Sequence, residues 1–446
     1  MAAPRGEFSS RFGFLMAASG SAVGLGNIWG FPTNAASNGG AAFLFTYLIL
    51  AFALAYPALM AELIIGRHAR ANAVTALKSI ATGEKTRVAA VTVGFVGIVT
   101  VSFILSFYSI VSGWMIAFFF DPVARLLGMN GLATWLTTDA VVRNSLFVVV
   151  FMMLTVFIIS AGVKDGIEKW ASRLMPSLII ILLLLIVYVL TLPGALDGLR
   201  AYLIPDFSRV ADPALLVSAM GQAFFSLSLG VGTMLVYGSY ISKRENLPTI
   251  GSLVALLDVG IAVLAGMLIL PAMYVALNNG VQIYDEAGGL IAGPGLIVSV
   301  LPALFETMGS IGVLVAFAFF ALMTIASLTS SISMLEVPVA YGVEHHGIDR
   351  PKAAIVIGAV ITVISLIIVF NFDPLFNLVV TYTTEVSQPL LGFAFCIFVA
   401  WIWRRNDILE EIKQGSPDVE SGLFWKIWPF YVKFICPVAI LVVYFQ

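Results

Sequence analysis

The stretch Ser19-Gly20-Ser21-Ala22-Val23-Gly24-Leu25-Gly26-Asn27 lies in the middle of an apolar run from about Phe12 to Phe31. Its glycines and asparagine occupy the depth at which a membrane helix is furthest from water. Glycine readily leaves the helical conformation, and backbone that does so inside a bilayer strands polar groups at several kcal/mol each. Such a break is tolerated only against protein or a cavity, where freed carbonyls can bind a cation and freed N–H groups an anion. The alternative is close helix packing, because Gly20 and Gly24 form a small-xxx-small pair.

The composition is that of a membrane protein. The 446 residues are 60% hydrophobic and 11% charged, with a mean hydropathy of +1.02, whereas soluble domains carry about 25% charged residues. The net charge of -2 gives no indication of nucleic-acid binding. Cys396 and Cys436 lie in apolar runs and His68, His345 and His346 in polar loops, so neither a disulfide framework nor a metal centre built on them is expected.

Eleven apolar runs reach the length of about 20 residues that a membrane-spanning helix needs. We therefore predict an all-α polytopic membrane protein that forms a single membrane domain over residues 1–446. The predicted spans are 12–33, 41–66, 88–120, 143–161, 170–192, 213–241, 249–277, 309–342, 352–371, 375–403 and 425–445.

Most of the 23 lysines and arginines fall on one side of these spans. With the N-terminus inside, only Arg125, Arg143, Arg200 and Arg209 lie outside, and Lys433 falls within the last span. Positively charged loops stay in the cytoplasm. We therefore expect a multi-pass protein of the inner (plasma) membrane, with a cytoplasmic N-terminus and an external C-terminus.

A second group of small and polar residues lies at mid-membrane depth in the sixth span, within Gln222–Gly232. Interrupted spans at corresponding places in two halves of a chain indicate a transporter site near the bilayer midplane. Halves of five spans each have opposite orientations. We therefore predict a 5+5 inverted repeat with broken spans one and six: residues 12–192, residues 213–403, and an extra span at 425–445.

Other polar residues also interrupt the apolar runs. The eighth span carries Ser327-Leu328-Thr329-Ser330-Ser331, whose hydroxyls either bond back to the preceding turn or extend the site. Intramembrane acids are costly and usually face a partner or a water-filled cavity. We expect Asp258 to bind an ion, Glu62 to brace broken backbone, and Glu336 and Glu385 to line the cytoplasmic half of the pathway.

The external connection from about Asn278 to Met308 contains Ala287-Gly288-Gly289, Pro294 and an apolar stretch, Leu296 to Phe305, that is too short to span. We expect a helical lid packed over the outer face. A re-entrant or surface helix without a special role is the alternative.

Several motifs, in order, resemble those of the neurotransmitter:sodium symporter family, in particular its bacterial amino-acid transporters related to the leucine transporter. They are Ser21–Asn27 followed by Phe31-Pro32, Asn38-Gly39-Gly40 with Phe43, Gln222–Gly232, and Leu328-Thr329-Ser330-Ser331. The resemblance covers nearly the whole chain. It implies a sodium-coupled secondary symporter, not an enzyme, that imports neutral amino acids by alternating access.

The resemblance further implies two sodium sites made of oxygen atoms, which suit a hard cation. Besides the substrate carboxylate, the first site would use the Ala22 carbonyl and the side chains of Asn27, Ser226 and Asp258. The second would use the carbonyls of Gly20, Val23 and Ala326 and the hydroxyls of Thr329 and Ser330.

By the same resemblance, the substrate carboxylate would meet backbone N–H groups of the first break, an anion site at a helix N-terminus. The implied substrate-binding residues are Ala22, Leu25, Gly26, Ile104, Tyr108, Phe225, Ser226, Ser228, Val231, Ser330 and Met334. Their side chains are mostly apolar, so we expect a neutral, hydrophobic amino acid. Val231 stands where the family commonly has an aromatic residue, which leaves room for a side chain as large as an aromatic one.

Two departures from the family concern the outer gate. Gly30 stands where an arginine usually precedes Phe-Pro, and Asn377 stands where its aspartate partner is expected. The outer ion pair is therefore absent, and outer closure falls to Tyr108 and Phe225. This absence also puts a standard alpha-amino-acid substrate in question.

Charged residues bear on two further questions. Chloride-dependent relatives carry a serine in the seventh span, but here Asp258 supplies a fixed negative charge, so we predict chloride-independent transport. At the inner face, Arg5 and Glu344 are placed like the family's cytoplasmic gate pair. Ordinary solvated loop charges are the alternative.

The sequence leaves some rival functions open. One is a transporter of the same fold with a non-standard substrate or proton coupling. An intramembrane enzyme would need a catalytic cluster, which the positions of the histidines and cysteines do not provide. A channel fits poorly with aromatic residues at the proposed site. The expected partners are an amino-acid substrate and the lipid bilayer, and the oligomeric state is open.

Overall fold

The computed structural model describes residues 6–204, 210, 212–284, 290–291 and 296–445. Over this part of the chain the fold is helical, apart from connections and one isolated bridge between Tyr284 and Leu290. The predicted all-α fold is confirmed. The helices are α1 (Arg11–Ala22), η1 (Gly26–Gly30), α2 (Phe31–Ser37), α3 (Ala41–Leu50), η2 (Ala51–Ala55), α4 (Tyr56–Ala69), α5 (Ala73–Ile80), α6 (Glu84–Leu126), α7 (Asn130–Thr137), α8 (Val141–Ser160), η3 (Val163–Glu168), α9 (Lys169–Leu190), α10 (Ala195–Leu203), α11 (Pro213–Ser226), α12 (Thr233–Gly238), α13 (Leu247–Asn278), η5 (Leu296–Val300), α14 (Leu301–Thr307), α15 (Ser310–His346), α16 (Arg350–Phe370), α17 (Phe372–Val380), η6 (Thr381–Ser387), α18 (Gln388–Ile397), η7 (Phe398–Ile402), α19 (Arg405–Lys413), α20 (Leu423–Phe430), η8 (Tyr431–Ile435) and α21 (Cys436–Tyr444).

Among the described residues, nine helical segments are long and apolar enough to cross a membrane, and a bent pair, Arg11–Ala22 with Gly26–Ser37, makes ten. The predicted sixth span is divided between α11 and α12, each too short to cross alone. The protein is therefore a multi-pass membrane protein, while the count of eleven spans and the repeat boundaries stay predictions.

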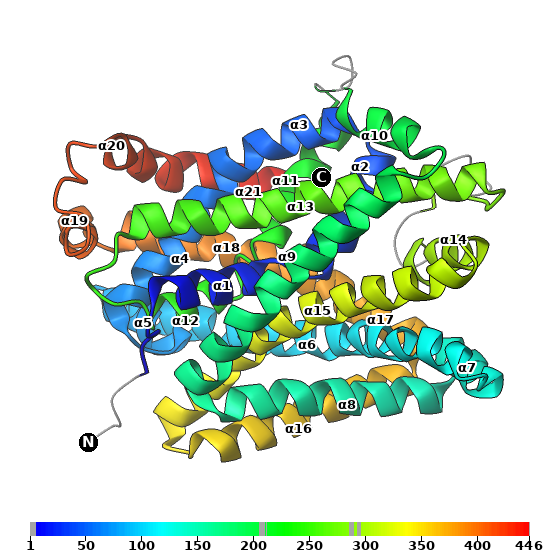
Figure 1. Cartoon of the computed structure of the whole chain (residues 1–446). Helices are drawn as coiled ribbons and strands as arrows, with labels where there is room; N and C mark the ends of the chain where they lie inside the picture. The colour runs from blue at the N-terminus through cyan, green and yellow to red at the C-terminus, as the bar shows by residue number, and fades with distance from the viewer. Residues whose placement is uncertain (1–5, 205–209, 211, 285–289, 292–295, 446) are drawn as a thin grey trace.

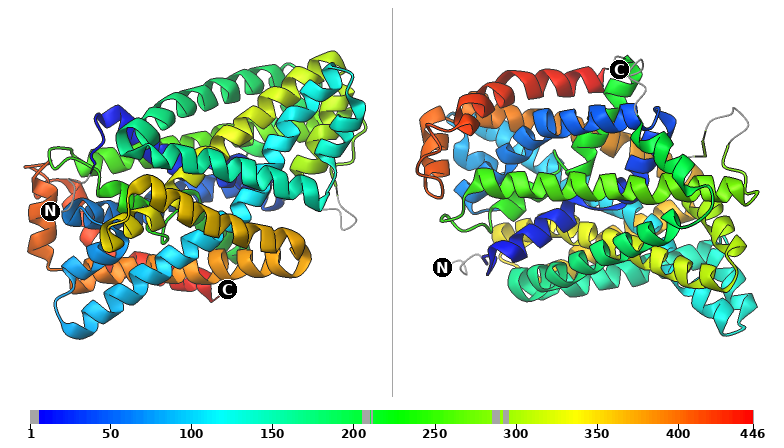
Figure 2. Two further views of the ribbon diagram at one scale, coloured as in Figure 1. Left: turned by 90° about the horizontal axis from the view of Figure 1, so that it is seen from below. Right: turned by 45° about the horizontal axis from the view of Figure 1, so that its top comes forward.

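The long helices run side by side and define two ends of the molecule (Figure 1). The described start of the chain, α5 and α19 lie at one end, and α7 and α14 lie at the other. The C-terminal helices pack against η2 and α4 (Figure 2), and Trp428 Nε1 of α20 donates to the Pro57 carbonyl of α4 at 3.0 Å.

Helix α6 packs along α15, with α8 and α16 beside them (Figure 1). A Cβ on Gly113 of α6 would lie only 3.0 Å from the Phe147 backbone, so the small residue allows close approach to α8. Hydroxyls also join helices: the Oγ atoms of Ser109 and Ser365 are 3.0 Å apart. Small residues and interhelical hydroxyl contacts are the usual means of packing membrane helices.

The first span is broken where the sequence predicts. Helix α1 begins after Ser10, whose Oγ accepts a hydrogen bond from Gly13 N at 2.9 Å. It ends at Ala22, Val23 is extended, and the helix resumes at Gly26 after a bend of 56°. A Cβ on Gly24 would lie 2.5 Å from Ser330 Oγ and 2.8 Å from the Tyr108 hydroxyl, so only glycine fits at this approach.

The sixth span is broken between Ser226 and Thr233. The backbone is left-handed at Ser228, with a φ of 52°, as well as at Gly230 and Gly232. A left-handed serine is strained and persists only where its surroundings hold it. The Glu62 carboxylate accepts hydrogen bonds from Gly230 N at 2.7 Å and Leu235 N at 3.3 Å. Glu62 therefore braces the broken backbone, as expected.

The external connection forms a short helical segment. It comprises η5 and α14, with Leu301, Leu304 and Phe305 buried and the Phe305 ring 5.7 Å from that of Phe319 in α15. This packing agrees with the expected helical cover at the end of the molecule that holds α7. Ala287–Gly289 and Pro294 lie outside the described residues.

Candidate functional site

The break in span one faces hydroxyls of α15. Ser330 Oγ lies 3.3 Å from the Gly20 carbonyl and 3.3 Å from the Val23 carbonyl, both on the broken first span. Thr329 Oγ1 lies 3.0 Å from the Ala326 carbonyl of its own helix, and a Cβ on Gly20 would lie 3.0 Å from Thr329 Cβ. The structure thus brings together all the residues predicted for the second sodium site.

Three of the four residues predicted for the first sodium site, Asn27, Ser226 and Asp258, form one buried network, while Ala22 lines the adjoining cavity with Asn27. Asn27 Nδ2 donates to Asp258 Oδ1 at 2.6 Å and to Ser226 Oγ at 2.9 Å. Ser226 Oγ in turn donates to Asp258 Oδ2 at 2.8 Å, and the Tyr47 hydroxyl lies 3.4 Å from Ser226 Oγ. Asn27, Ser226 and Asp258 therefore join the first, sixth and seventh spans at one point.

The atoms at these two places fit a sodium ion as transported substrate. They are carboxylate, amide, hydroxyl and backbone carbonyl oxygens, which are the donors that hard cations prefer. At the first place the Asp258 carboxylate also supplies a negative charge, and it accepts hydrogen bonds from two neutral donors, Asn27 Nδ2 and Ser226 Oγ. A monovalent cation there would balance that charge.

A small central cavity of about 40 Å³ lies between the two breaks. The Tyr108 hydroxyl accepts a hydrogen bond from Leu25 N at 3.3 Å on one wall. A Cβ on Gly26 would lie 2.8 Å from the Phe225 ring, so the ring packs directly on the backbone. The lining residues are Ala22, Gly24, Leu25, Gly26, Asn27, Ile104, Phe107, Tyr108, Phe225, Ser228, Val231, Ser330, Met334 and Gln388.

Every residue predicted to bind substrate lines this cavity except Ser226, which lies in the adjoining Asn27–Asp258 network. The sequence interpretation missed Phe107 and Gln388. Phe107 could have been found from its place beside Tyr108. Gln388 could have been found as an uncharged polar residue in the apolar run 375–403, by the reasoning that selected the acids.

A much larger cavity, of about 580 Å³, adjoins the central one. We call it the outer vestibule, because the predicted topology puts its residues Gly30 and Tyr444 near the external side. Phe107, Phe225 and Gln388 line both cavities and form their shared wall. Residues of the vestibule alone are Gly30, Asn34, Ser218, Gly221, Gln222, Phe224, Leu229, Val380, Thr384, Glu385, Pro389, Gly392, Ile440 and Tyr444.

Glu385 corrects one expectation. It was expected in the cytoplasmic half of the pathway, but it lines the outer vestibule together with Gly30. The reason is its depth, because Glu385 lies in the half of the segment Phe372–Ile402 that is nearer α17. Asn377, one of the two positions compared with the family's outer gate, is exposed and is not among the vestibule residues.

The inner end of α1 is held by a contact that the sequence interpretation missed. Glu168 accepts hydrogen bonds from Ser9 N at 2.7 Å, Ser9 Oγ at 2.8 Å and Ser10 Oγ at 2.9 Å. Of the predicted cytoplasmic gate pair, Arg5 lies outside the described residues. Glu344 accepts hydrogen bonds from Asn72 N at 2.7 Å and Asn72 Nδ2 at 2.9 Å.

Glu336 lies beside Arg350, at the end of its helix that is predicted to be cytoplasmic. Its carboxylate accepts a hydrogen bond from the Tyr240 hydroxyl at 2.5 Å and from Arg350 Nη1 at 3.1 Å, with Arg350 Nη2 also bonded to it. This buried pair joins α15 to the start of α16 and to the residues after α12.

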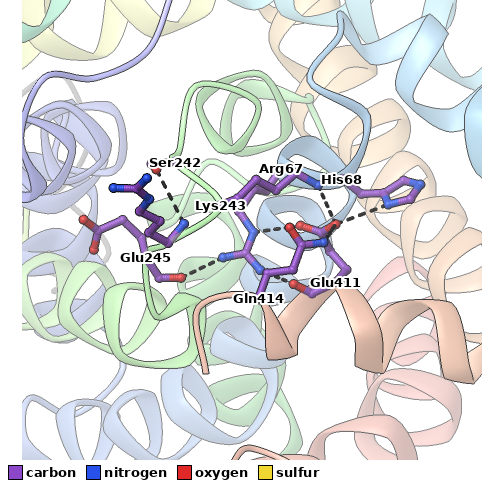
Figure 3. Close-up of polar contacts among 8 residues, drawn as sticks. Arg67, His68, Ser242, Lys243, Glu245, Glu411 and Gln414 are labelled. Atoms are coloured by element: carbon purple, nitrogen blue, oxygen red, sulfur yellow. Dashed lines mark hydrogen bonds and ion pairs between the residues drawn. The ribbon is translucent and has the colours of Figure 1, made fainter. Parts of the chain in front are cut away.

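A second buried charge cluster joins three segments, namely the end of α4, the connection before α13, and α19 (Figure 3). Arg67 Nε, at the end of α4, lies 2.8 Å from Glu411 Oε1 of α19, and Arg67 Nη1 donates to the Glu245 carbonyl at 2.7 Å. Lys243 Nζ lies 2.8 Å from Glu411 Oε2, and His68 Nδ1 lies 3.4 Å from it. Arg67 is 0% exposed and Glu411 2% exposed. The sequence interpretation did not predict this cluster, because its members lie far apart along the chain.

Comparisons with known proteins agree with this geometry. The sequence profile of the sodium:neurotransmitter symporter family matches residues 5–146 and 129–446. The chain is 32% identical to an uncharacterised sodium-dependent transporter of Bacillus subtilis, over 98% of this chain and 96% of that protein. It is 28% identical to the sodium- and chloride-dependent taurine transporter of Bos taurus, over 92% of this chain and 73% of that protein. The crystal structure of MhsT in complex with L-phenylalanine matches with a TM-score of 0.85 and 36% identity, over 99% of both chains.

Proposed function

The chain belongs to the sodium:neurotransmitter symporter family, a family of transporters and not enzymes, and we propose that it is a sodium-coupled symporter for neutral, hydrophobic amino acids. The observation that carries this proposal is the central cavity, where two broken helices meet. One end of the cavity offers the Tyr108 hydroxyl, held by the Leu25 N–H, as a donor for a carboxylate, and the other offers apolar walls. The phenylalanine bound in the related MhsT structure supports a ligand of this kind.

Coupling to sodium follows from the position of the Asn27–Asp258 network beside the cavity. Asn27 belongs to both, so a cation held by Asp258 lies next to the substrate carboxylate. Opposite charges in a buried site attract strongly. Each ligand then raises the affinity of the other by the same factor.

A second sodium ion links the broken first span to α15. Its oxygens come from Gly20 and Val23 on one side and from Thr329 and Ser330 on the other. Loss of this ion to the cytoplasm removes the link between the two elements. Spans one and six then hinge at their glycines and open the inner side, which gives import by alternating access.

Chloride independence follows from Asp258. Its carboxylate lies 2.8 Å from Ser226 Oγ, close to the Tyr47 hydroxyl. A chloride ion bound there would face a carboxylate across a few ångströms in a buried site, which like charges disfavour. The fixed carboxylate already balances the first sodium ion.

The proposed setting is the plasma membrane, with the end that carries α5 and α19 in the cytoplasm. The connections at this end contain most of the basic residues, including Arg67, Lys243 and Arg404. The outer vestibule then opens to the outside, and substrate enters past Phe225, which is 38% exposed.

An alternative is a transporter of the same fold for a non-standard substrate or with proton coupling. The vestibule favours a non-standard substrate over proton coupling, because Gly30 supplies no positive charge there while Glu385 supplies a carboxylate. A ligand with an extra positive group would suit this arrangement.

The test is equilibrium binding of a pooled set of neutral amino acids to the purified protein, in sodium and in lithium, potassium or choline. We expect binding in sodium alone, strongest for large apolar side chains. Binding without sodium would contradict coupling. Sodium binding without binding of any alpha-amino acid would favour the alternative.

A further inference from the structure

Gln388 lies on the wall shared by the central cavity and the outer vestibule. It is the first residue of α18 and is only 7% exposed. Its Nε2 donates to the Leu229 carbonyl at 2.9 Å, within the break of span six. This bond fixes the orientation of the amide, because the Gln388 oxygen would repel another carbonyl in that place.

The other end of the amide is unpaired. Among the described residues, Gln388 Oε1 is buried and has no hydrogen-bond partner. Buried acceptors are nearly always paired, since an unpaired one has lost its water without compensation. An exception on the wall of a ligand cavity indicates an acceptor waiting for a donor from the ligand.

The position of Gln388 is rigid. A Cβ on Gly230 would lie 2.3 Å from the Gln388 backbone oxygen, so α18 packs directly on the broken backbone. Val231, the next residue along, lines the same cavity with a short side chain. A ligand side chain that extends past Val231 therefore approaches Gln388 on the wall of the same cavity.

We propose that Gln388 Oε1 accepts a hydrogen bond from an N–H or O–H group on the substrate's side chain. This inference rests on the proposed function and narrows it. Within the class of large apolar amino acids, the site favours rings that carry a polar hydrogen, such as an indole or a phenol. A site built to pair with such a hydrogen discriminates against an analogue that lacks it, because its own acceptor then stays unpaired.

The test compares ligands that differ only in that hydrogen. Sodium-dependent binding is measured for tryptophan against benzothienylalanine, whose sulfur replaces the indole N–H, and for tyrosine against phenylalanine. For the unaltered protein we expect the donor-bearing member of at least one pair to bind about tenfold more tightly. In Gln388→Leu the same ratio is expected to fall to about one.

The ratio of affinities for the two ligands of a pair distinguishes a hydrogen bond to the substrate from a purely structural role of Gln388. If Gln388→Leu weakens all ligands equally, Gln388 only braces span six and the proposal is wrong. Thr384→Val is the matched control, because Thr384 lies one turn earlier, lines only the vestibule, and bonds to its own helix at the Val380 carbonyl. It is expected to keep the ratio of the unaltered protein.

The experiment also distinguishes failure of the Gln388 proposal from failure of the proposed symport function. Sodium-dependent binding of phenylalanine with a ratio near one in the unaltered protein would overturn the role of Gln388 and leave the proposed function intact. Absence of sodium-dependent binding for all four ligands would overturn both.

Discussion

Asn27 Nδ2 lies 2.6 Å from Asp258 Oδ1, so the broken first span is tied to a buried carboxylate on the seventh. In Asp258→Asn this carboxylate becomes neutral while its size is kept. We expect weaker sodium binding and a new requirement for chloride, because a mobile anion must then supply the missing charge. Uptake in sodium chloride and in sodium gluconate measures this. Chloride stimulation of the unaltered protein, persisting unchanged in Asp258→Asn, would contradict the role of Asp258.

The second predicted sodium site is tested at Thr329. Loss of its hydroxyl in Thr329→Ala removes one cation ligand, so we expect the half-saturating sodium concentration for substrate binding to rise about tenfold and the inward-open state to become more populated. Ser327→Ala is the matched control, because the Ser327 hydroxyl bonds back to the Thr324 carbonyl of its own helix at 3.0 Å. A Thr329→Ala variant locked in the outward-open state would contradict the proposed release step.

The Glu62 brace predicts a stability effect. In Glu62→Ala, Gly230 N and Leu235 N lose their acceptor in a buried place. Each unpaired buried group costs about 1–3 kcal/mol, so we expect a clearly lower unfolding temperature in detergent and weaker substrate binding. Glu62→Gln keeps one acceptor oxygen, so we expect its unfolding temperature to lie between those of the unaltered protein and Glu62→Ala. An unfolding temperature unchanged in Glu62→Ala would show that the break holds its shape without Glu62.

The two helix breaks could be predicted from the sequence. Gly24 and Gly230 indicate them, because a glycine weakens a helix at its own position, whatever packs around it. The sequence interpretation did not predict three other features: the place of Gln388 on the cavity wall, the contact of Glu168 with the start of α1, and the place of Glu385 in the outer vestibule. They depend on how distant helices rotate and approach one another.

The Arg67–Glu411 pair predicts a dependence of stability on pH. Burial alone would raise the pKa of the Glu411 carboxyl, but hydrogen bonds from His68 and Lys243 and the charge of Arg67 outweigh it and lower the pKa to about 2. A lowered carboxyl pKa adds stability above the ordinary value of about 4.3, and this stability is lost as the pH falls towards 2.

We therefore expect the unfolding temperature of the unaltered protein to fall below about pH 4. Glu411→Ala leaves Arg67 buried without its carboxylate and is expected to cost about 3–5 kcal/mol at neutral pH. The control is Glu420→Ala, since Glu420 forms an exposed pair with Lys413 that contributes at most about 1 kcal/mol. Equal effects of the two substitutions would mean that the buried cluster contributes no special stability.

Gly30 and Glu385 allow the missing outer ion pair to be rebuilt. Both line the outer vestibule, and among the described residues a Cβ on Gly30 comes within 4 Å of Gln222 Oε1 alone, at 3.7 Å, so a longer side chain fits there. We expect Gly30→Arg to pair with Glu385, close the vestibule more often and slow substrate association. Gly30→Gln, with similar length but no charge, is the control for bulk. Association rates from stopped-flow binding measure the difference, and Glu385→Gln combined with Gly30→Arg should restore the rate. If the arginine and glutamine variants behave alike, volume and not charge controls entry.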